Sequence, residues 1–186
     1  MKYQIIYADP PWDMGARNNK RVLVPKYNMM NEYDIYNLDI GELSDDNSAL
    51  FIWAINAKIP QAIELIRRNG FRYVGVAFCW IKTSQKTGEP NCRMAGNYTL
   101  QGMELCLLAI KGSMKTLDRT VRQVLKSPRE HHSKKPDVIR HEIVRLFGDI
   151  PRLELFAREK TEGWDVWGNE VESDIDLLNT KEVRGC

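Results

Sequence analysis

The feature that most constrains the fold of this chain is an apolar run that ends at two prolines. Residues 3–8 (Tyr-Gln-Ile-Ile-Tyr-Ala) are rich in β-branched and aromatic side chains and predict a buried β-strand. Pro10 and Pro11 then fix φ at about −65° and have no N–H to donate, so the strand must open into a stiff turn. In an open α/β sheet, that end of a strand is where ligands bind.

Residues 9–12 (Asp-Pro-Pro-Trp) combine a carboxylate, backbone carbonyls and an aromatic plane at this strand end. Hydrogen-bond acceptors in a stiff turn beside a stacking surface suit a planar ligand with an amino group, such as a nucleobase with an exocyclic amine. An Asx-type turn followed by a core Trp is the alternative interpretation. The strand before Asp9 and the position of Trp12 favour the binding interpretation.

The rest of the chain alternates apolar and amphipathic segments. Strands are predicted at residues 49–55, 73–82, 103–110 and 152–158, and helices at residues 59–69 and 136–147. Pro60 falls in the first turn of one helix, and Gly70 and Gly148 follow the helix ends. Polar residues 13–30 and 83–99 predict long loops. The order strand, helix, strand favours crossover connections and hence an α/β fold with a mostly parallel sheet flanked by helices.

The same sequence excludes several function classes. It contains neither the GxGxxG nor the GxxxxGK[ST] motif of nucleotide-binding loops, and no GxSxG nucleophile motif. His131 and His132 have no Cys, Asp or Glu at metal-ligand spacing, so we predict no metal. The cysteines form no disulfide framework, the chain starts directly in a strand, and no apolar run reaches the ~20 residues of a membrane span. We therefore expect a cytoplasmic protein that does not enter a membrane.

The net charge of +2 means that any nucleic-acid binding must come from local patches. The densest patch is the basic run at residues 126–135, which by pattern alone is typical of a solvated loop.

An ordered series of motifs resembles the S-adenosylmethionine-dependent adenine N6-methyltransferases, the family typified by the catalytic subunit of the mRNA adenosine methyltransferase (MT-A-seventy type). Small bacterial and phage DNA-modifying members are the most similar group. Beyond residues 9–12, the series includes residues 50–53 (LFIW), 80–83 (WIKT), 96–99 (GNYT), 133–137 (SKKPD), 154–158 (ELFAR) and 164–170 (WDVWGNE). The likeness extends from Tyr3 to about residue 172.

The resemblance implies a Rossmann-like fold in permuted order, with the catalytic motif before the cofactor motif. One domain would span residues 1–172, and residues 173–186 would form a frayed tail. The expected catalytic residues are Asp9, Pro10, Pro11 and Trp12. The expected S-adenosylmethionine contacts are Asp9, Lys135, Glu154, Phe156, Arg158, Asn169 and Glu170. The expected substrate contacts are Tyr27, Tyr98, Gln101 and Glu104.

Individual roles also follow from the resemblance. Asp9 and the Pro10 carbonyl would accept hydrogen bonds from the adenine N6 amine, and Trp12 would pack against the flipped base. Lys135 would meet the cofactor carboxylate, and Glu154 would support Arg158 or Lys135.

The resemblance implies methylation of the N6 amine of adenine in DNA, in a bacterial or phage-infected cytoplasm. RNA adenosine is the alternative substrate, and DNA is preferred because the chain is most like the small bacterial and phage members. A catalytically silent, nucleic-acid-binding partner is a further alternative, since the family includes such members. A homodimer or a separate partner subunit that supplies target recognition is compatible with either alternative.

Overall fold

The computed structural model describes residues 2–12, 30, 32–92, 94–95, 98–129 and 134–177. Within these residues a seven-stranded sheet has the order β7-β3-β6-β2-β1-β8-β9. Its strands are β1 (Tyr3–Ala8), β2 (Ser44–Ala54), β3 (Arg72–Thr83), β6 (Met103–Lys111), β7 (Val124–Pro128), β8 (Arg152–Leu155) and β9 (Asp165–Trp167). The short strands β4 (Met94–Ala95) and β5 (Leu100–Gln101) form a separate hairpin.

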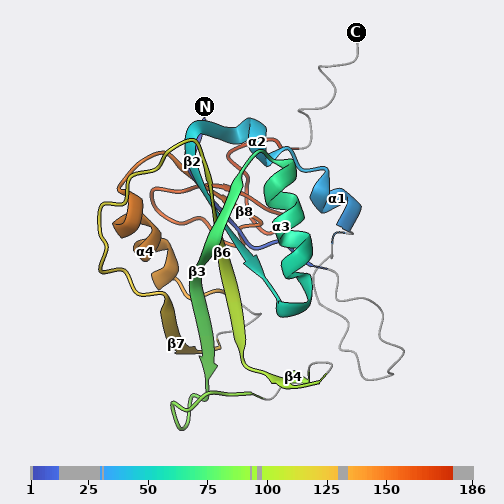
Figure 1. Cartoon of the computed structure of the whole chain (residues 1–186), viewed down its shortest axis with the longest axis vertical. Coiled ribbons are helices and arrows are strands. Elements are labelled where there is room, and N and C mark those ends of the chain that lie inside the picture. Colours follow the sequence, from blue (N-terminus) through green and yellow to red (C-terminus); the bar gives the residue numbers. More distant parts are fainter. Residues whose placement is uncertain are drawn as a thin grey trace.

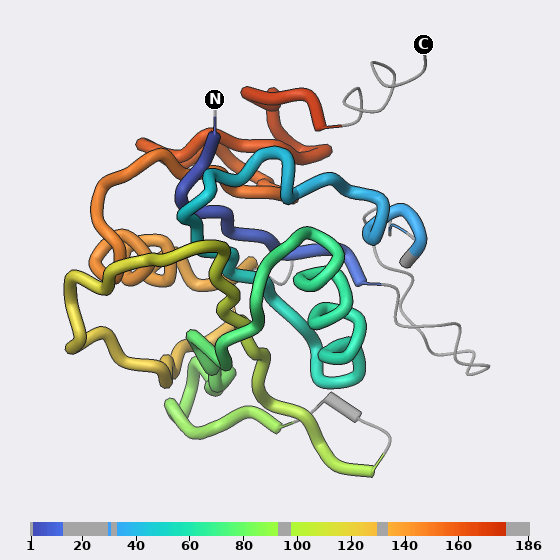
Figure 2. The backbone as a smooth tube through the Cα atoms, turned by 45° about the horizontal axis from the view of Figure 1, so that its top comes forward, coloured from blue at the N-terminus to red at the C-terminus, as the bar shows by residue number. Residues whose placement is uncertain are grey.

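The helices lie on both faces of the sheet (Figure 1). They are α1 (Glu32–Tyr36), α2 (Ile40–Leu43), the 3-10 helix η1 (Asn56–Lys58), α3 (Ile59–Arg68) and α4 (Val138–Phe147). Helix α3 covers one face and α4 covers the other, and Figure 2 shows the sheet strands passing between these two helices.

The buried strand β2 explains the two layers, because its side chains alternate between the faces. Leu50, Ile52 and Ala54 pack in the cluster that contains the α3 residues Ala62, Leu65 and Ile66. Ala49, Phe51 and Trp53 pack in the cluster that contains the α4 residues Ile139, Ile143 and Phe147. A strand that is apolar on both faces is therefore fully buried, as the continuous run at residues 49–55 predicted.

The predicted α/β fold with a mostly parallel sheet is confirmed. Each of β1–β2, β1–β8, β8–β9 and β3–β7 is a parallel pair. Only β6 runs antiparallel to its neighbours, β2 and β3. The carboxyl ends of β1, β2, β3 and β8 consequently meet at one end of the sheet, together with the start of β6.

The helix boundaries also follow the predictions closely. Pro60 lies in the first turn of α3, and Gly70 adopts a left-handed φ of 76° just after that helix. Helix α4 ends at Gly148, whose N–H donates to the Val144 carbonyl.

Three predicted segments were wrong in extent. Strand β2 begins at Ser44 and not at residue 49. The strand predicted at residues 152–158 ends at Leu155, because Phe156 takes a left-handed φ of 63° that breaks the extended backbone. Residues 124–128 form the edge strand β7, although the basic run was interpreted as a loop.

The first residues of the predicted tail, 173–177, contact the body of the protein. Leu177 is only 3% exposed and packs in the α3-side cluster. The Asp174 carboxylate accepts a hydrogen bond from the backbone N–H of Val166 on β9. Residues 174 and 177 are thus held by β9 and by the α3-side cluster, and residues 178–186 lie outside the described residues.

Candidate active site

The turn after β1 is held by Trp12. Its backbone N–H donates to the Pro10 carbonyl at 2.8 Å, and its indole Nε1 donates to the Trp53 carbonyl at 2.8 Å. Trp53 in turn donates from Nε1 to the Tyr7 hydroxyl at 2.7 Å. Trp12 is buried, so in this structure its ring fixes the turn against β2.

Asp9 lies beside Lys135, although 126 residues separate them in the chain. The Lys135 ammonium donates to Oδ2 of Asp9 at 2.7 Å and approaches Oε2 of Glu104 at 3.1 Å. It also lies 5.4 Å from the centre of the Trp53 ring, within the range of a cation–π contact. Lys135 therefore joins the end of β1 to the start of β6.

Lys82, at the carboxyl end of β3, pairs with the other oxygen of Glu104. Lys82 is 4% exposed and Glu104 is 9% exposed. Burial raises the pKa of Glu104, but the ammonium groups of Lys135 and Lys82 outweigh it and hold this pKa below its usual value. Burial lowers the pKa of Lys135, but the carboxylates of Asp9 and Glu104 outweigh burial and hold this pKa above its usual value. These ion pairs form a row of side chains of alternating charge type, which we call the charge row: Lys82, Glu104, Lys135 and Asp9.

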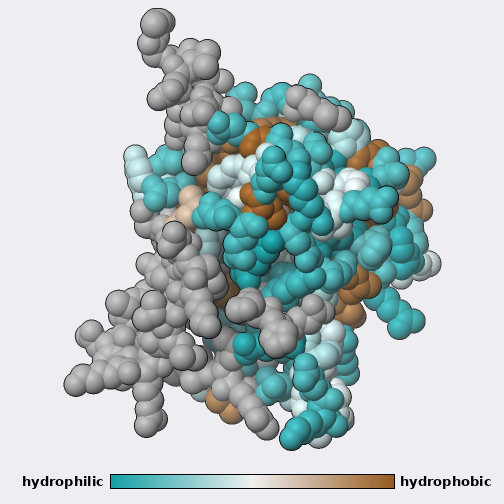
Figure 3. Space-filling model, turned by 180° about the vertical axis from the view of Figure 1, so that it is seen from behind, coloured by the Kyte–Doolittle hydropathy of each residue, from teal (hydrophilic) through white to brown (hydrophobic). Residues whose placement is uncertain are grey.

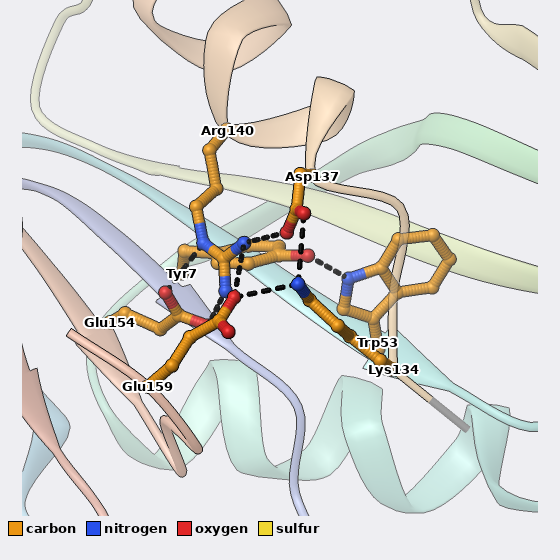
Figure 4. Close-up of polar contacts among 7 residues, drawn as sticks. All are labelled: Tyr7, Trp53, Lys134, Asp137, Arg140, Glu154 and Glu159. Carbon is orange, nitrogen blue, oxygen red and sulfur yellow. Dashed lines mark hydrogen bonds and ion pairs between the residues drawn. The ribbon is translucent and has the colours of Figure 1, made fainter. Parts of the chain in front are cut away.

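Glu154 on β8 pairs with Arg140 of α4 and not with Arg158 or Lys135, which corrects the expected partner. Its two oxygens accept from Arg140 Nε at 2.7 Å and Nη2 at 2.8 Å, a bidentate pair that Figure 4 shows between helix and strand. The reason is geometric, because the first turn of α4 lies over the β8 end and presents its inward Arg there. Burial raises the pKa of Glu154 and Arg140 opposes this effect.

Three further residues, Lys134, Asp137 and Glu159, complete this cluster. Lys134 lies 2.7 Å from Glu159 and 2.8 Å from Asp137, as Figure 4 shows. Asp137 also accepts from Arg140 Nη1 at 2.5 Å.

A cleft of about 190 Å³ opens between these groups. Its lining includes six of the seven expected cofactor contacts: Asp9, Lys135, Glu154, Phe156, Arg158 and Glu170. Asn169 is not part of the lining. Tyr7, Lys134, Arg140 and Glu159 complete it.

The left-handed backbone at Phe156 turns the chain out of β8 at the cleft. Its ring packs edge-on against Trp167 of β9, with 5.5 Å between ring centres. The next charged residue, Arg158, lies 3.9 Å from Glu170. A positive φ at a bulky residue is strained, and such strain is typical of functional sites.

The expected substrate contacts are less closely grouped. Glu104 belongs to the charge row, Gln101 lies in the hairpin strand β5, and Tyr98 is 99% exposed. Tyr27 lies outside the described residues, as do His131 and His132.

The sequence interpretation missed Arg140 and Lys82. A signal for Arg140 existed, since the carboxylate predicted inside the β8 core strand required a partner and Arg140 falls on the apolar stripe of α4. Lys82 had no comparable signal.

No helix among the described residues has the length and apolar character needed to cross a membrane. The described residues also contain no group of three or more His, Cys, Asp or Glu side chains that could hold a metal.

Comparisons with known proteins agree with the geometry. The MT-A70 family model matches residues 3–170. The type II methyltransferase M.MunI of Mycoplasma sp is 33% identical over 203 residues, which cover 98% of this chain and 84% of that protein. The N(6)-adenosine-methyltransferase catalytic subunit METTL3 of Homo sapiens is 28% identical over 185 residues, which cover 98% of this chain and 30% of the human protein.

Proposed function

The chain belongs to the MT-A70 family, and on this premise we propose that it transfers a methyl group from S-adenosylmethionine to the N6 amine of adenine in DNA. The observation that carries the proposal is the position of Asp9. Its carboxylate stands at the carboxyl end of β1, on the edge of the cleft, beside residues from β8 and the start of α4.

The cleft has the donors and acceptors that the proposed cofactor requires. An amino acid group with one ammonium and one carboxylate needs both acids and cations, and the cleft presents both signs. Glu170 and Arg158 could meet ribose hydroxyls or ring nitrogens, and Phe156 offers an apolar surface. When bound, S-adenosylmethionine would supply an activated methyl on a sulfonium, so the chain itself needs no nucleophile.

The chain's own residues would act on the adenine amine. The lone pair of that amine is conjugated with the ring, so the nitrogen is a weak nucleophile. Among the described residues only Lys135 donates to the Asp9 carboxylate, and it uses Oδ2, so Oδ1 is available to accept from the amine. A charge-assisted hydrogen bond of this kind contributes roughly 1.5–3 kcal/mol as positive charge develops on N6.

The charge row would hold Asp9 in place during this step. Lys135 fixes one carboxylate oxygen, and Glu104 fixes Lys135 from the other side. The row has two acids and two cations, so the Asp9 carboxylate and the Lys135 ammonium each have a partner of opposite charge in this half-buried site. Holding amine and methyl in line can contribute several more kcal/mol, roughly 7 or above in favourable cases.

DNA is the proposed substrate because the chain covers 84% of the type II methyltransferase M.MunI but only 30% of METTL3. In a duplex the adenine must leave the stack, at a cost of about a few kcal/mol. Target recognition can then come from this chain or from a partner. A bacterial or phage-infected cytoplasm stays the predicted location.

The test is methylation with isotopically labelled S-adenosylmethionine, followed by mass spectrometry of nucleosides. Labelled N6-methyldeoxyadenosine is the expected product from DNA, and label in N6-methyladenosine from RNA alone would remove the DNA proposal. Cofactor binding is measured separately by calorimetry, because a non-catalytic scaffold should show no binding.

Asp9→Ala tests the role of Asp9, and Asp45→Ala is its matched control. Asp9→Ala should abolish methyl transfer and leave cooperative unfolding intact. Asp45→Ala changes a partly exposed carboxylate near the start of β2 that does not line the cleft, and it should keep full activity. Near-normal turnover by Asp9→Ala would exclude Asp9 from the mechanism.

A further inference from the structure

The connection from β6 to the edge strand β7, together with β7 and the residue after it, carries cations that the proposed reaction does not use. In residues 112–129 there are five Lys or Arg and one Asp, whereas the whole chain has a net charge of only +2, so the remainder is net negative. The five cations are exposed, and we call them the basic edge: Lys115, Arg119, Arg122, Lys126 and Arg129.

The basic edge lacks compensating charge in the part of the chain that the structure describes. The one acid in the segment, Asp118, is already paired with Arg145 of α4 at 2.6 Å. None of the five cations forms an ion pair with a described residue. Their positive field is therefore available to an anionic partner.

The segment is fixed to the body of the protein. Leu117 donates its N–H to the Leu146 carbonyl at the end of α4. The side-chain amide of Gln123 donates to the Val76 carbonyl of β3 at 2.6 Å, and the backbone carbonyl of Gln123 accepts from the Cys79 backbone N–H at 2.8 Å. The cations thus sit on a preformed support, which lowers the entropy that binding would cost.

The basic edge ends close to the candidate active site. In Figure 1 the segment runs down the left side of the molecule into β7, whose carboxyl end lies beside that of β3. Four strand spacings of ~4.8 Å separate β7 from β1, which gives roughly 19 Å. The six chain steps from Arg129 to Lys135 allow at most about 21 Å. The strand separation of roughly 19 Å and the upper limit of about 21 Å each correspond to about six base pairs of duplex rise.

Strand β7 is poorly suited to pair with a strand of another protein. Its five residues include Lys126 and Pro128, and Lys and Pro on an edge oppose strand addition. Seen from behind relative to Figure 1, most of the coloured residues of the molecule are hydrophilic, and the hydrophobic ones form small separate patches (Figure 3).

We infer that the basic edge binds the phosphate backbone of duplex DNA that flanks the target adenine, about six base pairs away. This inference rests on the proposed function for its substrate, and it adds a second contact region outside the cleft. The contacts are to phosphates, so they position the duplex and do not read its sequence.

The experiment compares two double variants with equal charge loss. Arg122→Gln/Lys126→Gln removes two cations from the basic edge. Arg67→Gln/Arg72→Gln removes two exposed cations from the end of α3 and the start of β3, at the opposite end of the sheet. Because all four side chains are exposed, both variants should fold, and circular dichroism checks this.

Binding of a fluorescent duplex is measured by anisotropy between about 50 and 200 mM salt. Loss of two phosphate contacts should make the slope of log affinity against log salt shallower by about 1.8. The control variant should keep the wild-type slope. An unchanged slope for the basic-edge variant, an equal change in both variants, or a change seen only with single-stranded RNA would overturn the inference.

Methyl transfer is measured in parallel to separate this inference from the proposed function. Wild-type protein that binds DNA with the expected slopes but transfers no methyl group contradicts the function and keeps the basic edge. Where transfer occurs, the basic-edge variant should raise KM for DNA with little change in kcat, because phosphate contacts act equally in ground and transition states.

Discussion

Replacing Arg140 by Met should destabilise the protein strongly, because it leaves the Glu154 carboxylate buried without its cation. The two side chains are only 10% and 8% exposed, and they form two hydrogen bonds. Removing one member of a buried pair costs about 3–5 kcal/mol. For a domain of this size, a loss of about 3 kcal/mol lowers Tm by roughly 6–12 °C.

The loss should depend on pH. Burial already raises the pKa of Glu154, and Arg140 is the main group that opposes this effect. Without Arg140 the folded-state pKa rises further above the unfolded value. A carboxyl with a raised folded-state pKa favours folding below its unfolded pKa, and that contribution is lost as pH rises through the folded pKa. The difference between wild type and Arg140→Met should therefore be larger at about pH 8 than at about pH 5.

Urea unfolding followed by Trp fluorescence at both pH values measures this difference. Arg145→Met is the matched control, since Arg145 is on the same helix but pairs with Glu142 and Asp118 at the surface. It should have little effect at either pH. The double variant Arg140→Met/Glu154→Gln should recover much of the loss, because no buried charge remains. A cost no larger than that of Arg145→Met, or a difference that does not grow with pH, would refute the reasoning.

Three further changes test other parts of the site. In the folded protein the pKa of Glu104 is held below its unfolded value, so ionised Glu104 adds stability that wild type loses as pH falls through this lowered pKa. Glu104→Gln lacks this contribution at every pH, so the urea midpoints of variant and wild type should differ near neutral pH and converge in acid. Trp12→Phe should cost about 1–3 kcal/mol in urea unfolding, because the Trp53 carbonyl loses its donor inside the fold; no loss would show that water replaces it. Gly168→Ala should destabilise by about 1–3 kcal/mol and weaken cofactor binding in calorimetry, because the new Cβ would fall on the Ala157 backbone; unchanged affinity would separate this loop from the cofactor.

Local patterns predicted the parts of the fold that local physics determines. Three elements were predicted close to their observed bounds. They are β1, from its apolar run, α3, from the Pro near its start and the Gly after its end, and α4, from its apolar stripe. Strand β7 was missed because Lys126 and Pro128 resemble a solvated loop. Its outward side chains are polar since it is an edge strand, and only its pairing with β3 identifies it.

In the site too, some residues were predicted from local sequence patterns and others were found only from the fold. The motif at residues 9–12 and the motif around Glu154 were found from sequence, and the structure brings Asp9 and Glu154 to one cleft. Their partners were not found from local pattern. Lys82 pairs with Glu104 only because β3 and β6 are adjacent and antiparallel. Arg140 pairs with Glu154 because the fold brings the first turn of α4 beside β8, which no spacing within either segment encodes.

The charges that line the cleft suggest how ligand choice could arise. Four acid–base pairs are present: Asp9 with Lys135, Glu154 with Arg140, Glu159 with Lys134, and Glu170 with Arg158. A simple anion or cation would have to break such a pair and leave one member uncompensated, which is costly in a half-buried site. A ligand that carries both an ammonium and a carboxylate can instead exchange partners with a pair. The balanced lining therefore favours a zwitterionic amino acid group. The additional positive charge of a sulfonium would be attracted toward the Asp9 carboxylate, where the adenine amine is proposed to bind.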